Sequence, residues 1–247
     1  MAGQVVTHVL LDFFGTLVRY SPSRTEQGYH ASHALAASMG ARVDYQGFLQ
    51  AWAAESALFD ERSAVDDSEF SMEEVGEAFL SRILRRDPDA TEITAFVDEY
   101  VSEWNTAVVY PPGVAGLMSA LADRFRLAVV TNTHKADLVP GHLSAMGIAH
   151  HFDAVVTSVE VGWRKPHPAI YAEALLRLGA TPDTVVFAGD SYLADYLGPI
   201  SAGLTSFLID PAEQHSIPPD RRLRSLHDLP VHLRVPDVRA HGNNRQR

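Results

Sequence analysis

Apolar and polar positions alternate in blocks along the second half of the chain, from about residue 126 onward. Short apolar runs, each typical of a buried parallel strand, are separated by longer segments with helical periodicity. The expected strands are Arg126–Thr131, Phe152–Thr157, Thr184–Ala188 and Thr205–Ile209, and the expected helices are His134–Met146, Pro168–Leu178 and Leu193–Ala202. This alternation predicts βαβ units, and therefore a parallel sheet with helices on both faces.

The first hundred residues contain one more strand and then a long helical stretch. Val9–Leu11 is a short apolar run that predicts another buried strand. Ser71 and Glu74 have the spacing of a capping box and precede apolar positions 75, 79, 80 and 83. The segment from Ile93 to Trp104 repeats the helical spacing, and two further helices are expected near Ala31–Met39 and Phe48–Phe59.

Together these patterns predict an α/β protein whose Rossmann-like parallel sheet core carries an inserted α-helical cap. The core is expected to comprise residues 1–17 and 111–235, and the cap residues 18–110. Pro111–Gly113 is a natural hinge where the chain returns to the core. Residues 236–247 are polar and basic, and we expect this tail to be disordered.

Composition narrows the class of protein. The net charge of −11 argues against a nucleic-acid partner, and the absence of cysteine excludes disulfides and thiolate chemistry. The N-terminal apolar run lacks the features of a signal peptide, and no stretch approaches the roughly 20 apolar residues of a membrane span. We therefore expect a cytoplasmic protein without a membrane partner, and leave open a homodimer formed through the cap helices.

Polar residues follow four of the predicted strands. Asp12 follows the first, Thr131 and Asn132 the second, Lys165 lies in the loop after the third, and Gly189, Asp190 and Asp195 follow the fourth. Because parallel strands end at one edge of the sheet, these groups are expected to converge there. Carboxylates packed this closely repel one another, so a divalent cation is expected between them, and oxygen ligands favour Mg²⁺.

These motifs, with the run Gly162–Pro168, make the chain resemble the haloacid dehalogenase-like hydrolase superfamily, in the subgroup whose helical cap follows the first motif. The resemblance implies that Asp12 is the nucleophile, that Thr131 orients the transferring group and that Lys165 neutralises developing charge. It also implies that Mg²⁺ binds Asp12, Asp190, Asp195 and the main-chain carbonyl of Phe14. Gly15, Thr16, Asn132, Trp163 and Tyr192 are the further residues expected to contact substrate.

Phe14 departs from the pattern of the family's phosphatases, which usually have a second aspartate there. That aspartate protonates the leaving oxygen and later activates water, general acid–base help worth about 10²–10⁴ in rate, and a phenyl ring cannot replace it. Tyr20, Tyr29, His30 and His33 in the first part of the cap are candidates for supplying this proton.

Three functions remain open at this point. The first is a Mg²⁺-dependent phosphohydrolase that acts on a small anionic metabolite through an aspartyl phosphate on Asp12. The second is a 2-haloacid dehalogenase, a branch that carries an aromatic residue at the place of Phe14 but dispenses with metal; Arg19 and Arg24 could then bind the substrate carboxylate. The third is a catalytically degenerate protein that binds a phosphorylated ligand without turnover.

Overall fold

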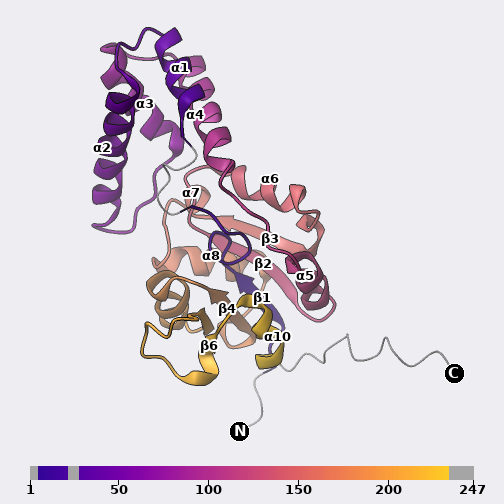
Figure 1. Cartoon of the computed structure of the whole chain (residues 1–247). Helices are drawn as coiled ribbons and strands as arrows, with labels where there is room; N and C mark the ends of the chain where they lie inside the picture. The colour runs from indigo at the N-terminus through magenta and orange to yellow at the C-terminus, as the bar shows by residue number, and fades with distance from the viewer. Residues whose placement is uncertain (1–4, 22–27, 234–247) are drawn as a thin grey trace, which may run out of the picture.

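The computed structural model describes residues 5–21 and 28–233, and within them a six-stranded parallel sheet forms the centre of the molecule (Figure 1). The strands lie in the order β3-β2-β1-β4-β5-β6. Their bounds are β1 (His8–Leu11), β2 (Arg126–Thr131), β3 (Phe152–Thr157), β4 (Val185–Gly189), β5 (Thr205–Ile209) and β6 (Arg222–Leu223). Because β1 pairs with both β2 and β4, the strand order reverses at β1, and ligands of such sheets bind outside the strand ends at that point.

Helices cover both faces of the sheet, because successive strand residues point to opposite sides. Leu11 belongs to the apolar cluster under α5 (Val114–Ala122), α6 (Leu138–Ala145) and α10 (Leu229–His232). Its neighbour Leu10 belongs to the cluster on the other face, under α8 (Pro168–Leu178). This three-layer α/β architecture confirms the fold class predicted from the sequence.

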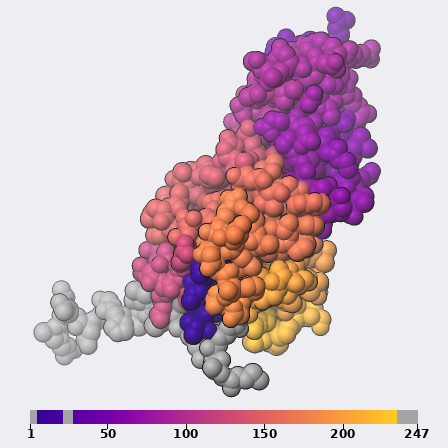
Figure 2. All heavy atoms as spheres, turned by 180° about the vertical axis from the view of Figure 1, so that it is seen from behind, coloured from indigo at the N-terminus to yellow at the C-terminus, as the bar shows by residue number. Residues whose placement is uncertain are grey.

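Four helices between β1 and β2 form a separate unit that projects away from the core (Figures 1 and 2). They are α1 (His30–Ser38), α2 (Tyr45–Ser63), α3 (Met72–Leu84) and α4 (Ala90–Asn105). Capping boxes begin α3 at Ser71 and α4 at Asp89. Apolar and aromatic residues such as Phe48, Phe79 and Phe96 fill its interior, so this helical unit has a hydrophobic core of its own.

In the described residues, main-chain hydrogen bonds join the helical unit to the core at two places. At the first, Arg19 and Val109 exchange main-chain hydrogen bonds of 3.0 and 2.8 Å where the chain leaves and re-enters the core. At the second, residues 67–72 lie against core loops: the Glu69 amide donates to Gly162, that of Arg164 to Asp67, and that of Met72 to His134. We call residues 67–72 the docking segment.

Several predicted boundaries were wrong for identifiable reasons. The helix expected from His134 begins only at Leu138, because the preceding residues form a loop that contacts the docking segment. The helix expected over Leu193–Ala202 is a π-helical segment, Tyr192–Leu197, followed by α9 (Gly198–Ser201). Pro199 lacks the amide that an α-helix would aim at the Asp195 carbonyl, and Ser206 donates to that carbonyl instead.

Two strand predictions also need correction. The fourth strand of the sheet starts at Val185, not Thr184, because Pro182–Thr184 forms a short 3₁₀ turn, and β6 follows the strand expected to be last.

Arg24 and the predicted tail 236–247 lie outside the described residues. Within the described ranges, the helices are too short or too polar to cross a lipid bilayer.

Candidate active site

A lysine and two aspartates form a buried ionic group at the carboxyl ends of the central strands. Lys165 Nζ lies 2.7 Å from Asp12 Oδ1 and 2.6 Å from Asp195 Oδ1. Asp12 and Asp195 are 5% and 1% exposed and Lys165 is 4% exposed, so solvent screens these charges weakly. Two carboxylates and one ammonium therefore leave an excess negative charge in a poorly hydrated place.

Local structure holds each of these side chains. Asp12 directly follows β1, and its amide donates to Ala188 of β4. The Asn132 side chain binds the Lys165 main chain twice, accepting from its amide at 2.7 Å and donating to its carbonyl at 3.0 Å. Asp195 Oδ2 accepts from the Ser191 amide at 2.8 Å. Asn132, expected to contact substrate, thus serves in this structure to fix the loop that carries Lys165.

Asp190 completes a cluster of acids suited to a divalent cation. One carboxylate oxygen from each of Asp12, Asp190 and Asp195 lies within 4.8 Å of the others. Gly15 has φ +91°, and a Cβ on it would overlap the Asp190 carboxylate, so glycine here allows the acid to approach the main chain. We call Asp12, Lys165, Asp190 and Asp195 the strand-end site.

The pKa values reflect this crowding. Asp190 as a whole residue is exposed, but partial desolvation of its carboxyl, together with the charges of Asp12 and Asp195, raises its pKa to about 7. Burial likewise raises the pKa of Asp195, although Lys165 opposes the shift. Burial would lower the pKa of Lys165, but the two aspartates raise it, so its amine stays charged. A cation among the acids would offset their repulsion, and the donor set therefore fits Mg²⁺.

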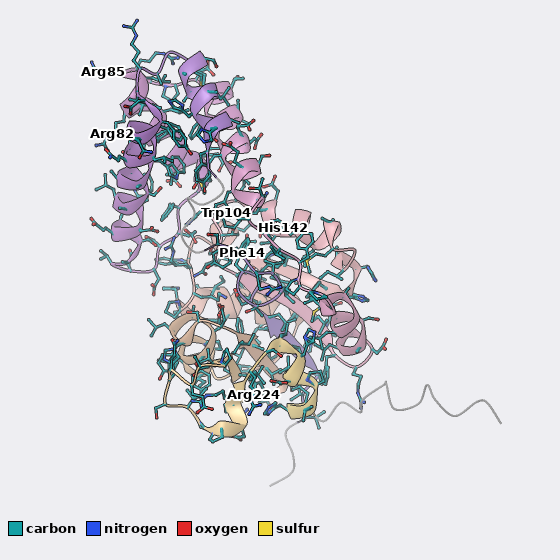
Figure 3. The ribbon with its side chains drawn as sticks, in the orientation of Figure 1. Phe14, Arg82, Arg85, Trp104, His142 and Arg224 are labelled. Atoms are coloured by element: carbon teal, nitrogen blue, oxygen red, sulfur yellow. The ribbon has the colours of Figure 1, made fainter. Side chains whose placement is uncertain are left out.

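Phe14 lies at the junction between the core and the helical unit, where aromatic rings gather (Figure 3). Its ring meets Trp104 of α4 edge-on at 5.3 Å and Tyr20 at 5.7 Å. His142 of α6 lies 6.2 Å away and also contacts Tyr110 through Nδ1. Burial lowers the pKa of His142. Phe14 thus packs across the junction, at the position where the family's phosphatases usually have an acid.

A cavity of about 250 Å³ opens beside Phe14, between the core and the helical unit. We call it the aromatic cavity because Phe14, Tyr20, Tyr100 and Trp104 lie in its wall. Its other lining residues are Asp60, Met72, Val101, Asn132, Thr133, His134, Lys135, Leu138 and Arg164. Among the described residues, the four of the strand-end site do not line this cavity, but Phe14 stands two positions after Asp12 and Asn132 binds the main chain of Lys165, so the cavity lies near the strand-end site.

The four candidate proton donors occupy different places. Tyr20 lines the aromatic cavity. Tyr29 is 1% exposed and stacks on Tyr100 inside the helical unit, with ring centroids 4.7 Å apart. His30 stacks on Tyr45, and His33 Nε2 lies 2.9 Å from the Val43 carbonyl. Of these four, Tyr20 is the one that the structure brings to the cavity.

Of the other residues predicted for the site, some lie at the strand ends and others lie away from the aromatic cavity. Thr131 ends β2 and is 1% exposed, and Thr16 lies buried in the loop after Asp12. Trp163 stacks on His167 at 4.1 Å and Tyr192 stacks on His215 at 4.3 Å. Neither Trp163 nor Tyr192 is among the residues that line the aromatic cavity in the described part of the chain.

Sequence reasoning missed a buried ionic cluster around Glu69, whose side chain is 1% exposed. Glu69 Oε1 lies 2.7 Å from Arg164 Nη2 and 3.1 Å from His134 Nδ1, and Oε2 accepts from Ser158. Although burial raises it, these hydrogen bonds and the nearby His134 and Arg164 bring the pKa of Glu69 down to about 2. His134 could have been suspected because it follows Thr131 at a strand end. A lone acid in a loop gives no such signal.

Comparison with known proteins places the chain in a family. Residues 6–203 match the family model of the haloacid dehalogenase-like hydrolases, and the chain belongs to this family. It is 31% identical over 199 residues to the bovine haloacid dehalogenase-like hydrolase domain-containing protein 3, covering 75% of this chain and 77% of that protein. The human protein of the same name is 41% identical over 113 residues, which cover 43% of this chain and 44% of that one.

Enzymes with named activities are also among the relatives. The glyceraldehyde 3-phosphate phosphatase of Methanothermobacter thermautotrophicus is 36% identical over 101 residues, which are 41% of this chain and 44% of that protein. With several of these relatives the match spans about half of their length. The chain thus belongs to a family of hydrolases, as the sequence predicted.

Solved structures confirm the fold. A 2-haloacid dehalogenase from Pseudomonas syringae superposes with a TM-score of 0.70 at 23% identity, covering 93% of this chain and 99% of that one. A HAD phosphatase from Thermococcus onnurineus superposes with a TM-score of 0.65 at 22% identity, covering 94% and 100%. Both a dehalogenase and a phosphatase thus share the architecture, and function must be argued from the site.

Proposed function

We propose that this protein is a Mg²⁺-dependent phosphohydrolase that transfers the phosphoryl group of a small anionic substrate to Asp12 and then to water. The observation that carries the proposal is the strand-end site, where Asp190 stands beside the Asp12–Lys165–Asp195 group. A third acid next to an ionised nucleophile is costly unless a cation joins them. The phosphatase names of several relatives support the same conclusion.

Mg²⁺ would be held by Asp12 and Asp190, with the Phe14 main-chain carbonyl as a further ligand and Asp195 as a supporting acid. When bound, it would offset the negative charge of the acids and of the phosphoryl group. Asp195 already accepts from Lys165 and the Ser191 amide, so its part is mainly to hold these groups in place.

The chain's own residues supply the rest of the chemistry. An Asp12 carboxylate oxygen forms a bond to phosphorus while the bond between phosphorus and the leaving oxygen breaks, and the electron pair departs with that oxygen. Thr131 and the neighbouring main-chain amides orient the phosphoryl oxygens. Lys165, within 2.7 Å of Asp12 Oδ1, stabilises the charge that develops. Water then attacks the phosphorus of the aspartyl phosphate while the bond between phosphorus and the Asp12 oxygen breaks; the electron pair returns to the Asp12 carboxylate, and the proton that water loses passes to solvent.

Phe14 restricts which substrates react well. Without an acid at this position the leaving oxygen departs as an anion or takes its proton from water. General acid catalysis is worth about 10²–10⁴ in rate, so alkyl phosphates lose that factor while acyl and aryl phosphates, whose oxygen leaves readily, do not. The enzyme is therefore expected to rank phosphate donors by their leaving groups.

One observation favours a second candidate, a 2-haloacid dehalogenase. Halide leaves without a proton, and Phe14 suits such a reaction. Asp190 argues against it, because a third carboxylate beside Asp12 has no part in metal-free attack on carbon. Arg19, which could bind a haloacid carboxylate in such an enzyme, is exposed and pairs through its main chain with Val109.

Acetyl phosphate and 2-chloropropionate separate the two candidates. We expect phosphate release from acetyl phosphate in Mg²⁺, its loss in EDTA and its return when Mg²⁺ is restored, with no chloride released from either enantiomer of 2-chloropropionate. Chloride release that persists in EDTA would establish the dehalogenase instead. Binding of phosphate without turnover of either compound would leave a ligand-binding protein.

A further inference from the structure

Aromatic rings supply much of the wall of the aromatic cavity, and those of Phe14 and Trp104 stand at 81° to each other. Phe14 and Trp104 meet across the junction between core and helical unit (Figure 3), and Tyr20 and Tyr100 lie in the same wall with Met72. Aromatic walls of this kind bind planar groups through face and edge contacts. The volume of about 250 Å³ is below the roughly 300–1,000 Å³ of pockets for drug-sized ligands, so it suits a small ring system.

The cations in this wall are already paired with acids of the protein. Lys135 Nζ lies 3.2 Å from both Glu73 Oε1 and Asp98 Oδ1. Arg164 Nη2 lies 2.7 Å from Glu69 Oε1, and Nη1 of the same guanidinium lies 3.8 Å from Asp60 Oδ1. A second anionic group on the substrate would therefore have to compete with these acids and would face their repulsion.

Leaving-group chemistry points to the same class of compound by a separate route. With Phe14 in place of an acid, a substrate reacts well when its oxygen tolerates negative charge. A phenol meets this condition, since its anion is stabilised by the ring and its pKa is near the value of about 10 for tyrosine. Aliphatic alcohols have much higher pKa values and do not.

We infer that the preferred substrate is a phosphate monoester of a flat, uncharged, phenol-like group, whose ring lies in the aromatic cavity while its phosphate lies at Asp12. The inference rests on the proposed phosphohydrolase function. In the reaction the ester oxygen leaves phosphorus with its electron pair as a phenolate, which then takes a proton from water. The aromatic cavity thus binds the part of the substrate that Phe14 requires to be a good leaving group.

Three phosphate donors test the inference in the presence of Mg²⁺. Phenyl phosphate has the proposed ring; 4-carboxyphenyl phosphate adds a second anion without making the phenolate a poorer leaving group; acetyl phosphate reacts readily but has no ring. We expect kcat/KM for phenyl phosphate to exceed that for 4-carboxyphenyl phosphate by about tenfold or more. Equal values, or the reverse ranking, would overturn the inference.

Variants of Trp104 show whether the ring is recognised at this cavity. In Trp104→Leu, kcat/KM for phenyl phosphate is expected to fall about tenfold, through KM, relative to the value for acetyl phosphate; Trp104→Phe should restore most of the difference. Phe79→Leu removes an aromatic side chain from the interior of the same helical unit, where Phe79 is fully buried and is not part of the cavity wall. It should lower stability without changing the ratio of the two substrates.

The outcomes separate this inference from the function on which it rests. If acetyl phosphate is not hydrolysed with Mg²⁺, the phosphohydrolase function itself fails. If acetyl phosphate is hydrolysed but Trp104→Leu lowers kcat/KM for both substrates equally, or Phe79→Leu shifts their ratio as much, the phosphohydrolase function stands and the aromatic preference is wrong.

Discussion

The strand-end site and the aromatic cavity lie side by side but are built in different ways. The strand-end site takes its groups from loops of one sheet, and Asp12, Lys165 and Asp195 are each at most 5% exposed. The aromatic cavity takes its wall from both bodies of the molecule: Phe14 and Asn132 belong to the core, while Met72 and Trp104 belong to the helical unit.

Because of this difference, we expect the strand-end site to determine the rate of the chemical step and the aromatic cavity to determine which substrate is preferred. Charges fixed by strand ends need little rearrangement during the reaction, which is how a site stabilises charge that develops on a substrate. A wall divided between two bodies depends on how they meet, so replacing residues of the helical unit should change the preferred substrate more than the chemical step. Substitutions that alter one of the two regions should therefore show whether the other is affected.

Removal of the nucleophile should have the largest effect. Asp12→Asn keeps the shape of the side chain but removes the attacking oxygen's charge, and kcat for acetyl phosphate is expected to fall by roughly 10⁴-fold or more. Phosphate release at saturating Mg²⁺ measures it, with circular dichroism showing that the variant is folded. If Asp12→Asn retains a tenth of the activity, Asp12 is not the nucleophile.

Replacement of Glu69 should change stability in a way that depends on pH. Its pKa is about 2 in the folded protein against an ordinary value of 4.5, so the ionised form contributes about 3 kcal/mol at neutral pH. This contribution is present above pH 4.5 and is lost as the pH falls toward 2. Glu69→Gln, which keeps the shape but not the charge, should therefore be less stable by about that amount at pH 7.

Denaturant unfolding in EDTA at several pH values provides the measurement. The gap between wild type and Glu69→Gln should narrow steadily below pH 4.5. Glu73→Gln is a matched control, because Glu73 is half exposed and pairs with Lys135 at the surface, so its replacement should cost well under 1 kcal/mol. A gap that is constant across the whole range would show that the charge of Glu69 does not stabilise the docking segment.

Restoration of an acid at position 14 should improve the poorest substrates. Phe14→Asp is expected to raise kcat/KM for glycerol phosphate by about 10- to 100-fold, because protonation of an alkoxide is what the native site lacks. Phe14→Leu removes the aromatic contact with Trp104 without adding an acid and should give no gain. Equal rates for the two variants would mean that another group already supplies the proton.

Crowding of the metal site through Gly15 should have the smallest effect of the four. A Cβ at Gly15 would overlap the Asp190 carboxylate, and φ +91° also strains any residue with a side chain. Gly15→Ala is expected to weaken Mg²⁺ activation about tenfold while leaving the cavity's substrate ranking unchanged. Titration of activity with Mg²⁺ tests this, and an unchanged midpoint would place the cation away from Asp190.

The sheet could be predicted because its signals are local. Each buried strand is a short apolar run, and the polar residue after it marks the strand's end, so the sequence alone was enough to predict that Asp12, Lys165 and Asp195 meet. The π-helical segment could not be predicted, since the effect of Pro199 depends on Ser206, which reaches the Asp195 carbonyl from β5.

The junction between the core and the helical unit was harder to predict because its contacts join distant parts of the chain. Glu69 reaches Ser158 and Arg164 across about ninety positions of sequence, and nothing near Glu69 indicates where it will dock. Trp163 and Tyr192 show a different case. Both stand close in sequence to Lys165 and Asp190, yet each stacks on a histidine and neither lines the aromatic cavity in the described residues, so their contact with substrate stays a prediction.

The partners of Glu69 also limit how freely the helical unit could be exchanged between relatives. A helical unit from a relative that lacks an acid at position 69 would leave Arg164, the residue before Lys165, without its counter-ion. It would also leave His134 without the Glu69 carboxylate as a partner. Chimeras joined only where the chain leaves and re-enters the core, near Arg19 and Val109, would then be inactive because this ionic cluster is broken. Their inactivity would say nothing about which ligand the new helical unit selects. The docking segment has to be transferred together with the three core residues that Glu69 contacts, which are His134, Ser158 and Arg164.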